Sequence, residues 1–158
     1  MTFNEIPYKR ADVAQWKAMV EDLIARFKAA KTFEEADAVF YEAELADVEY
    51  ATMTALAQIR RDIDTRDEFY DGETAFYDAE LPKLEPVFKA WTQATLDSPF
   101  RKQLEEKYGA VPFLNAEIAT KTFAPEIVED LQKENTLCNR YSKLIASAQI
   151  PFRDEILT

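Results

Sequence analysis

The segment from Asp62 to Glu73, DIDTRDEFYDGE, contains acidic residues and a glycine that could form a calcium-binding loop. An EF-hand loop places oxygen ligands at positions 1, 3 and 5 and a glycine at position 6, where the backbone turns sharply. Counting from Asp62, Asp64 fits position 3, but Arg66 occupies position 5 and Asp67 occupies position 6. One ligand and the turn are both missing, so we expect a solvated junction between two helices.

The sequence contains no histidine. Histidine is the commonest general base and the commonest metal ligand in proteins. Although glutamates are abundant, this absence excludes the Glu-x-x-His motifs of di-iron helical bundles. We therefore expect no catalytic, cofactor-binding or metal-binding residue in this chain. An enzyme that uses carboxylates alone is an alternative that the composition leaves open.

Three further groups could bind or react, and we prefer a structural interpretation of each. Cys138 has no histidine partner and lies in an apolar helix stripe, so we expect a buried, unreactive thiol. Arg60 and Arg61 lie beside aspartates, which favours exposed mixed-charge pairs. Several aromatic side chains could line a peptide groove, but at helical spacing we expect them in the core: Phe40, Tyr41, Phe69, Tyr70, Phe76 and Tyr77.

The 158 residues carry a formal net charge of −11. Such a surface repels the phosphates of nucleic acids and the anionic face of a membrane. No apolar run reaches the roughly 18 residues of a membrane span, and the N-terminal residues MTFNEIPYKR lack a signal-peptide core. With one cysteine and no export signal, we expect a cytoplasmic protein that binds neither nucleic acid nor membrane.

The longest helical pattern begins after Thr32, which forms a capping box with Glu35. One apolar stripe of this helix comprises Ala36, Val39, Ala43, Ala46, Tyr50, Met53 and Ala57. A second stripe comprises Leu45, Val48, Leu56, Ile59 and Ile63. Two apolar stripes predict that the helix packs against neighbours on two sides. A charge at Leu56, in the second stripe, should therefore unfold the domain.

Caps and breakers divide the rest of the chain into further helices. Asp12 predicts the start of a first helix, whose apolar stripe is Trp16, Val20, Leu23, Phe27 and Ala30. Only a tight turn separates it from the long helix, so the two should form an antiparallel hairpin. Thr65 and Glu68 form a second capping box, which predicts that a third helix begins at Arg66.

Prolines and glycines set the later boundaries. We expect a break near Leu81 at Pro82, a helix end near Leu96, short helices from Ser98 to Gly109 and from Pro112 to Thr122, and a last long helix from Pro125. One face of that last helix carries Ile127, Leu131, Cys138, Tyr141, Ile145 and Ala148. The residues IPFRDEILT are typical of a strand that enters a turn. We therefore predict an all-α fold: one helical domain over residues 1–158, an antiparallel bundle with an incomplete strand or extended tail at its C-terminus.

Two long runs are not explained by helix propensity alone: QIRRDIDTRDEFYDGE (Gln58 to Glu73) and KTFAPEIVEDLQKENTLCNRYSKLIASAQIPF (Lys121 to Phe152). Both closely resemble the N-terminal helical region of oligoendopeptidase F enzymes, in the thimet-oligopeptidase family of zinc metallopeptidases. SPFRKQLEEKYG and IPYKRADV agree with that region in position and character. One small departure is Ala124, where the resemblance leads us to expect a serine that caps the last long helix.

The resemblance implies a parent enzyme that cleaves oligopeptides with a zinc ion, held by a His-Glu-x-x-His helix and a distant glutamate. This chain has no histidine, so no catalytic residue carries over. We expect a non-catalytic N-terminal domain that forms one wall of the peptide channel and packs on the catalytic domain. A fragment of this kind should expose a large apolar patch and self-associate. The alternative is a stand-alone acidic helical protein-interaction module.

Overall fold

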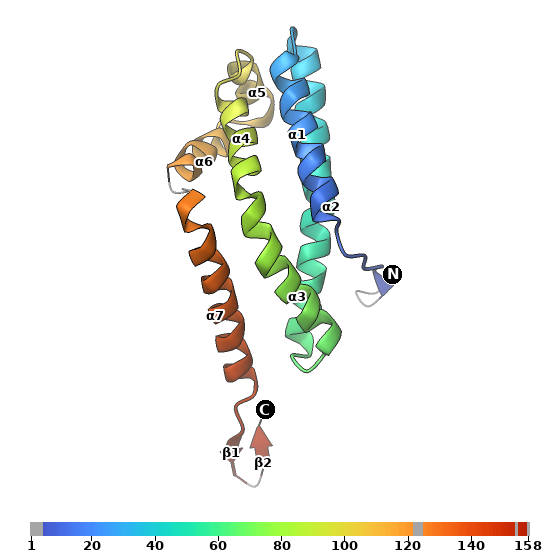
Figure 1. Ribbon diagram of the computed structural model, residues 1–158, viewed down its shortest axis with the longest axis vertical. Helices are drawn as coiled ribbons and strands as arrows, with labels where there is room; N and C mark the ends of the chain where they lie inside the picture. The colour runs from blue at the N-terminus through green and yellow to red at the C-terminus, as the bar shows by residue number, and fades with distance from the viewer. Residues whose placement is uncertain (1–4, 122–124, 154, 158) are drawn as a thin grey trace.

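The computed structural model describes residues 5–121, 125–153 and 155–157, and long helical rods that run antiparallel to their neighbours dominate it (Figure 1). The helices are α1 (Val13–Ala29), α2 (Phe33–Ile63), α3 (Glu68–Glu80), α4 (Glu85–Leu96), α5 (Arg101–Tyr108), α6 (Val111–Thr120) and α7 (Val128–Ala146). The 3-10 segments Leu81–Leu84 and Pro125–Ile127 precede α4 and α7. The all-α antiparallel fold predicted from the sequence is confirmed.

Side-chain caps fix the starts of the first two helices as predicted. The Asp12 carboxylate accepts a hydrogen bond from the Gln15 N–H at 2.9 Å and starts α1. The Thr32 hydroxyl accepts from the Glu35 N–H at 3.3 Å and starts α2. The Glu35 carboxylate reaches back to the Lys31 N–H at 2.7 Å, so the box closes one residue earlier than its usual form. The two helices form the expected hairpin, drawn in blue and cyan in Figure 1.

The structure corrects two of the predicted helix starts. Helix α3 begins at Glu68 rather than Arg66, because the Asp67 carboxylate accepts from the backbone N–H groups of residues 69 and 70. Helix α5 begins at Arg101, because the Ser98 hydroxyl caps a preceding turn by accepting from the Phe100 N–H at 3.1 Å. At α3 the nearby Asp67 caps the helix in place of the predicted Thr65, whereas at α5 Ser98 binds the N–H group expected of a cap but the first turn is not α-helical.

Breaks and ends elsewhere follow the sequence more closely. The α3–α4 rod changes to 3-10 geometry at Leu81, as the prolines predicted, and Gly109 ends α5 with a φ of 91°. Helix α7 begins with a 3-10 turn at residues 125–127 and has no side-chain cap. The predicted loss of a capping hydroxyl concerns Ala124, which lies outside the described residues.

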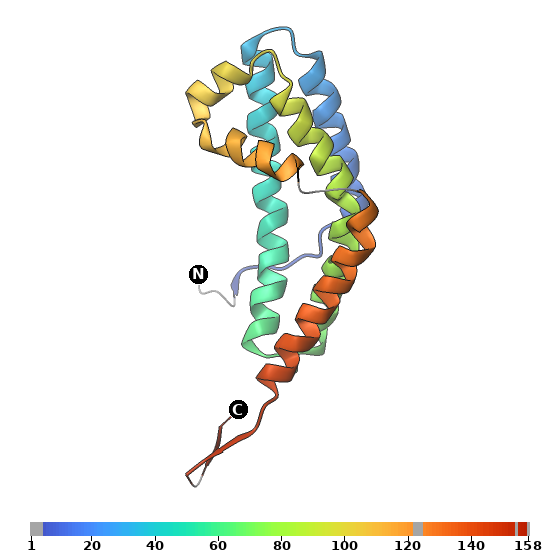
Figure 2. The same cartoon turned by 90° about the vertical axis from the view of Figure 1, so that its left-hand side faces the viewer.

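The C-terminal segment contains the predicted strand, and the structure completes it as a hairpin. Strand β1 (Ile150–Phe152) turns back and pairs antiparallel with β2 (Glu155–Leu157), with Ile150 opposite Leu157. Arg153, in the turn, has a φ of 57°, which a tight reversal requires. The segment therefore forms a two-stranded hairpin that extends away from the helices (Figure 2).

The core lies where α1 packs against both α2 and α4. The α1 stripe predicted from the sequence is buried from Trp16 to Phe27. Ala36, Val39 and Phe40 of α2 complete one apolar cluster, together with Leu104 and Phe113 from the short helices. Leu84 and Val87 complete a second cluster around Trp16. The first apolar stripe of α2 is thus partly or fully covered by its neighbours, as expected.

The second stripe of α2 is mostly exposed, which corrects the prediction that neighbours pack against both stripes. Leu56 is only 4% exposed, but the other members are 45 to 68% exposed: Leu45, Val48, Ile59 and Ile63. No described helix covers this side of α2. Helix α2 therefore packs on one side within the described part of the chain, and its other side presents apolar groups to solvent.

Leu56 and Val48 provide a matched test of this arrangement. Leu56→Asp places a charge at a buried site, and we expect a loss of about 4 kcal/mol and a melting temperature lower by roughly 10 °C. Val48→Asp, on the exposed side of the same helix, should change the melting temperature by less than about 2 °C. Circular dichroism melts measure both; equal effects would show that the two sides of α2 are assigned wrongly.

Candidate functional site

Helix α7 directs its polar side toward the rest of the chain. The Gln132 amide donates to the Ala79 carbonyl at 2.7 Å, and the Lys143 ammonium pairs with Asp71 at 2.5 Å. The Asn139 amide donates to the Asp78 carboxylate. These α7 residues recur at helical spacing and all meet α3. No residue of α7 is buried in the described structure, and the contacts named here that hold it on α3 are polar, so we call them the polar seam.

The opposite side of α7 is apolar and exposed. Its large side chains are 58 to 67% exposed: Leu137, Tyr141, Leu144 and Ile145. A surface helix normally buries its apolar stripe and exposes its polar face. Helix α7 does the reverse, and we call these four residues the α7 apolar face. Cys138 lies beside them and is exposed, so the predicted burial of its thiol is wrong: the stripe exists but points outward.

Helix α2 carries a second exposed apolar surface. Its members are Tyr41, Leu45, Val48, Ile59 and Ile63, which we call the α2 outer stripe. At about 100° per residue they share one side of the helix, and at 1.5 Å per residue they extend over roughly 33 Å. Extended exposed apolar surfaces of this kind mark sites of protein interaction.

A cleft of about 310 Å³ lies between α2 and α4, which both pack on α1. Helix α6 closes one end of it, and Figure 2 shows α6 lying across the bundle. Its aromatic lining comprises Trp16, Phe40, Phe88, Trp91 and Phe113. We call this feature the α2–α4 cleft. Its volume falls at the lower end of the range of small-ligand sites.

Two carboxylates from α2, Glu44 and Asp47, lie at this cleft. Both side chains are exposed, but partial desolvation raises the pKa of Glu44, and the nearby charge of Asp47 raises it further. Neither carboxylate forms an ion pair within the described residues. The cleft therefore combines an apolar interior with negative charge that lacks a counterion.

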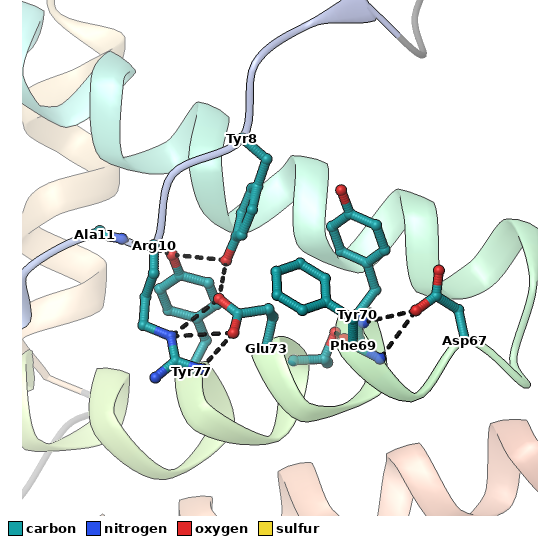
Figure 3. A network of polar contacts seen from close by, with 9 residues as sticks. Tyr8, Arg10, Ala11, Asp67, Phe69, Tyr70, Glu73 and Tyr77 are labelled. Carbon is teal, nitrogen blue, oxygen red and sulfur yellow. Dashed lines mark hydrogen bonds and ion pairs between the residues drawn. The ribbon is translucent and has the colours of Figure 1, made fainter.

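A polar network attaches the N-terminal segment to α3 (Figure 3). The Arg10 guanidinium binds both oxygens of Glu73, with Nε at 3.1 and 3.0 Å, and the Tyr8 hydroxyl donates to Glu73 at 2.5 Å. The Ala11 N–H donates to the Tyr77 hydroxyl at 3.0 Å. Arg10, and to a lesser extent Tyr8, hold the pKa of the buried Glu73 below its ordinary value against the opposing effect of burial. Glu73 is thus a charged, fully bonded anchor.

Arg61 is buried, which corrects the prediction of an exposed pair. It is 1% exposed and donates to Asp62 at 2.8 Å and to the Asn139 carbonyl of α7 at 3.1 Å. Its Nε is buried and has no hydrogen-bond partner in the described structure. Burial also raises the pKa of Asp78, and the Arg61 charge partly offsets this effect. Arg60, partly buried, donates to the Tyr70 hydroxyl and the Ile6 carbonyl, both at 2.6 Å.

The other sequence candidates have structural roles. Asp64 binds Arg66 and Asp67 caps α3, so two of the carboxylates considered for a calcium loop are engaged by the protein. Of the six aromatic candidates, Phe40 and Tyr77 are buried, whereas Tyr41 and Phe69 are more than half exposed. Among the described residues no cluster of histidine, cysteine or acidic side chains could hold a metal ion. The donor set of this chain does not fit a zinc site that requires imidazoles.

The fold and these surfaces define a class: an all-helical bundle with extended apolar faces that its own described residues do not cover. A family model for the peptidase M3 N-terminal domain matches residues 3–123, more than half of the chain. The chain therefore belongs to this peptidase family, as the resemblance in its sequence indicated. A search of curated proteins returned no match.

Solved structures extend the similarity beyond the matched range. A protein described as an oligoendopeptidase F is 40% identical with a TM-score of 0.94, over 100% of this chain. Pz peptidase A, solved with an inhibitor, is 39% identical (TM-score 0.93), and an oligoendopeptidase F from Bacillus anthracis is 36% identical (TM-score 0.93); each comparison covers 99% of this chain. This chain spans only 28 to 29% of the length of those three. No described helix is long and apolar enough to cross a membrane.

Glu73→Gln tests the N-terminal network through its pH dependence. Because the folded pKa of Glu73 lies below its unfolded value, its stabilisation is complete above the unfolded value of about 4.5 and disappears as the pH falls through the folded value. At pH 7 we expect the variant to lose about 2 kcal/mol of unfolding free energy.

Urea titrations of wild type and variant at pH 7 and pH 3 measure this difference, which should shrink at the lower pH. Glu106→Gln, an exposed change on α5, is the control and should have little effect at either pH. A difference between wild type and Glu73→Gln that is independent of pH would contradict a charged Glu73.

Proposed function

We propose that this chain acts as the non-catalytic N-terminal domain of a zinc-dependent oligoendopeptidase and that its partner is the catalytic domain of that enzyme. The observation that carries the proposal is the reversed amphipathicity of α7, whose apolar face points away from the bundle. Leaving several large apolar side chains in water is unfavourable by about 25 cal/mol per Å². The similar solved chains are more than three times as long, which supplies a protein surface to cover this face.

The polar seam between α3 and α7 supports the same assignment. Ion pairs and amide hydrogen bonds hold α7 in place without using its apolar side, so that side stays available for a second partner. Arg61, Asn139 and Asp78 join α2, α7 and α3. These links also support our proposal that residues 1–158 form a single helical domain.

In this proposal the zinc and all catalytic residues would belong to the partner, and the zinc would supply Lewis-acid chemistry there. The chain itself contributes a wall of the channel that receives oligopeptides. The absence of histidine is consistent with this division, and no step of the reaction is assigned to these residues. We further propose a cytoplasmic location, which suits a chain with a single cysteine.

A stand-alone acidic interaction module is the second candidate. It would use the α2 outer stripe and the α7 apolar face to bind a separate protein, and it would need no peptidase. Peptide hydrolysis does not distinguish the two, because neither candidate is active alone. The family membership and the similarity over the whole chain favour the peptidase domain.

Self-association of the purified chain tests the α7 apolar face. We expect the wild type to form dimers or larger species at about 100 μM in reducing buffer. Leu137→Gln with Leu144→Gln should weaken association at least tenfold, because two exposed leucines lose their burial in the contact. Glutamine retains helix propensity, so the melting temperature should stay unchanged.

Ser142→Gln, at an exposed polar position of the same helix, is the control and should associate like the wild type. Sedimentation velocity over a range of concentrations gives the dissociation constants. A wild type that stays monomeric throughout would contradict an available docking face. Hydrolysis of a fluorogenic oligopeptide that increases with added zinc would contradict a non-catalytic chain.

A further inference from the structure

We propose that the α2–α4 cleft binds a lysine or arginine side chain of a peptide, with its aliphatic stem against the aromatic lining and its charged end at Glu44 and Asp47. Such side chains bury their methylene groups on apolar surfaces and keep the cation in a polar environment. The assignment of a peptide as ligand rests on the proposed function. The preference for a cation with an apolar stem rests on the cleft alone.

The cleft is preformed by packing that fixes its aromatic rings. Trp16 stacks on Tyr50 with ring centroids 3.8 Å apart and contacts Phe88 at 4.9 Å. Phe40 lies parallel to Phe113 with centroids 6.1 Å apart. Small residues complete the lining, so space remains between the rings. A ligand therefore enters without displacing a side chain from the core.

The charge at the cleft selects a cation. Elsewhere on α2, Asp37 pairs with Lys107 at 2.5 Å and Glu42 pairs with Arg26 at 2.6 Å. Glu44 and Asp47 are exposed at the mouth of the cleft and have no ion pair within the described structure, and desolvation together with the Asp47 charge raises the pKa of Glu44. A bound ammonium or guanidinium would pair with these carboxylates and lower the pKa of Glu44, whereas a neutral or anionic group would do neither. The lining tryptophans also attract cations through their ring faces.

The cleft stays open when the outer stripe of α2 is covered. Phe40 and Ala43 project from α2 roughly 100 to 160° away from that stripe at 100° per residue. The apolar lining of the cleft and the α2 outer stripe therefore lie on different sides of one helix, and Glu44, one turn from Val48, lies at their boundary. This separation lets the two proposals be tested independently.

Intrinsic fluorescence provides a direct readout. The chain contains two tryptophans, Trp16 and Trp91, and both line the cleft. We would titrate the chain with acetyl-Ala-Lys-Ala-amide, with the norleucine peptide that has the same stem without the amine, and with the glutamate peptide. We expect a saturable change in emission with the lysine peptide, at least fivefold weaker binding of the norleucine peptide and no binding of the glutamate peptide.

Two variants and one control distinguish the contribution of the carboxylates from that of the shape of the cleft. Glu44→Gln with Asp47→Asn should reduce the affinity for the lysine peptide to that for the norleucine peptide. Glu106→Gln with Glu134→Gln makes the same change in net charge at exposed sites away from the cleft and should bind like the wild type. Ala116→Leu fills the cleft and should weaken both peptides. Circular dichroism melts confirm that each variant is folded.

Equal affinity for the lysine and norleucine peptides would overturn the proposal, as would unchanged binding by the Glu44→Gln, Asp47→Asn variant. Emission that changes with protein concentration instead of peptide would show that a second copy fills the cleft and would also overturn it. Leu137→Gln with Leu144→Gln should leave the peptide titration unaltered. Failure of the cleft proposal is therefore distinct from failure of the docking face on α7.

Discussion

The burial of one apolar side of α1 organises the described structure. Helices α2 and α4 both pack on α1, and the row from Trp16 to Phe27 fills the space between them. Because α1 separates these two helices, they do not close on each other, and the α2–α4 cleft remains above the α1 floor. The same hydrophobic contact thus stabilises the bundle and leaves the α2–α4 cleft open.

The polar contacts attach the segments that the hydrophobic core does not hold, namely the N-terminal segment and α7. Glu73 fixes the N-terminal segment on α3 through Arg10 and Tyr8, and Arg61 brings α2 to α7. A helix attached in this way keeps its apolar side free. The division explains how a protein with an ordinary core can also present long apolar faces, which suits a domain of a larger peptidase.

Most signals that act over a few residues predicted the structure correctly, with the start of α3 as an exception, whereas signals that depend on distant partners did not. Asp12, Thr32, Pro82 and Gly109 act on adjacent backbone, so the helices they bound could be predicted. Helical periodicity shows that a stripe exists but does not show which neighbour covers it. The sequence therefore predicts burial of Cys138 and of the whole second stripe of α2, although Cys138 and all members of that stripe except Leu56 are exposed. Arg61 was placed outside because α7, which covers it, follows almost eighty residues later.

The sequence could not reveal the cleft, because it arises where four helices meet and no motif records it. Glu44 and Asp47 resemble any other acids on a solvated helix until the lining is known. The absence of histidine, by contrast, could be interpreted at once, since it limits chemistry whatever the fold.

The exposed position of Cys138 has a practical consequence. The chain has a single thiol, and it lies at the margin of the α7 apolar face. A maleimide dye would attach at that one position and at the margin of the surface that we assign to the missing partner. Its emission would then report whether a second protein docks on this face.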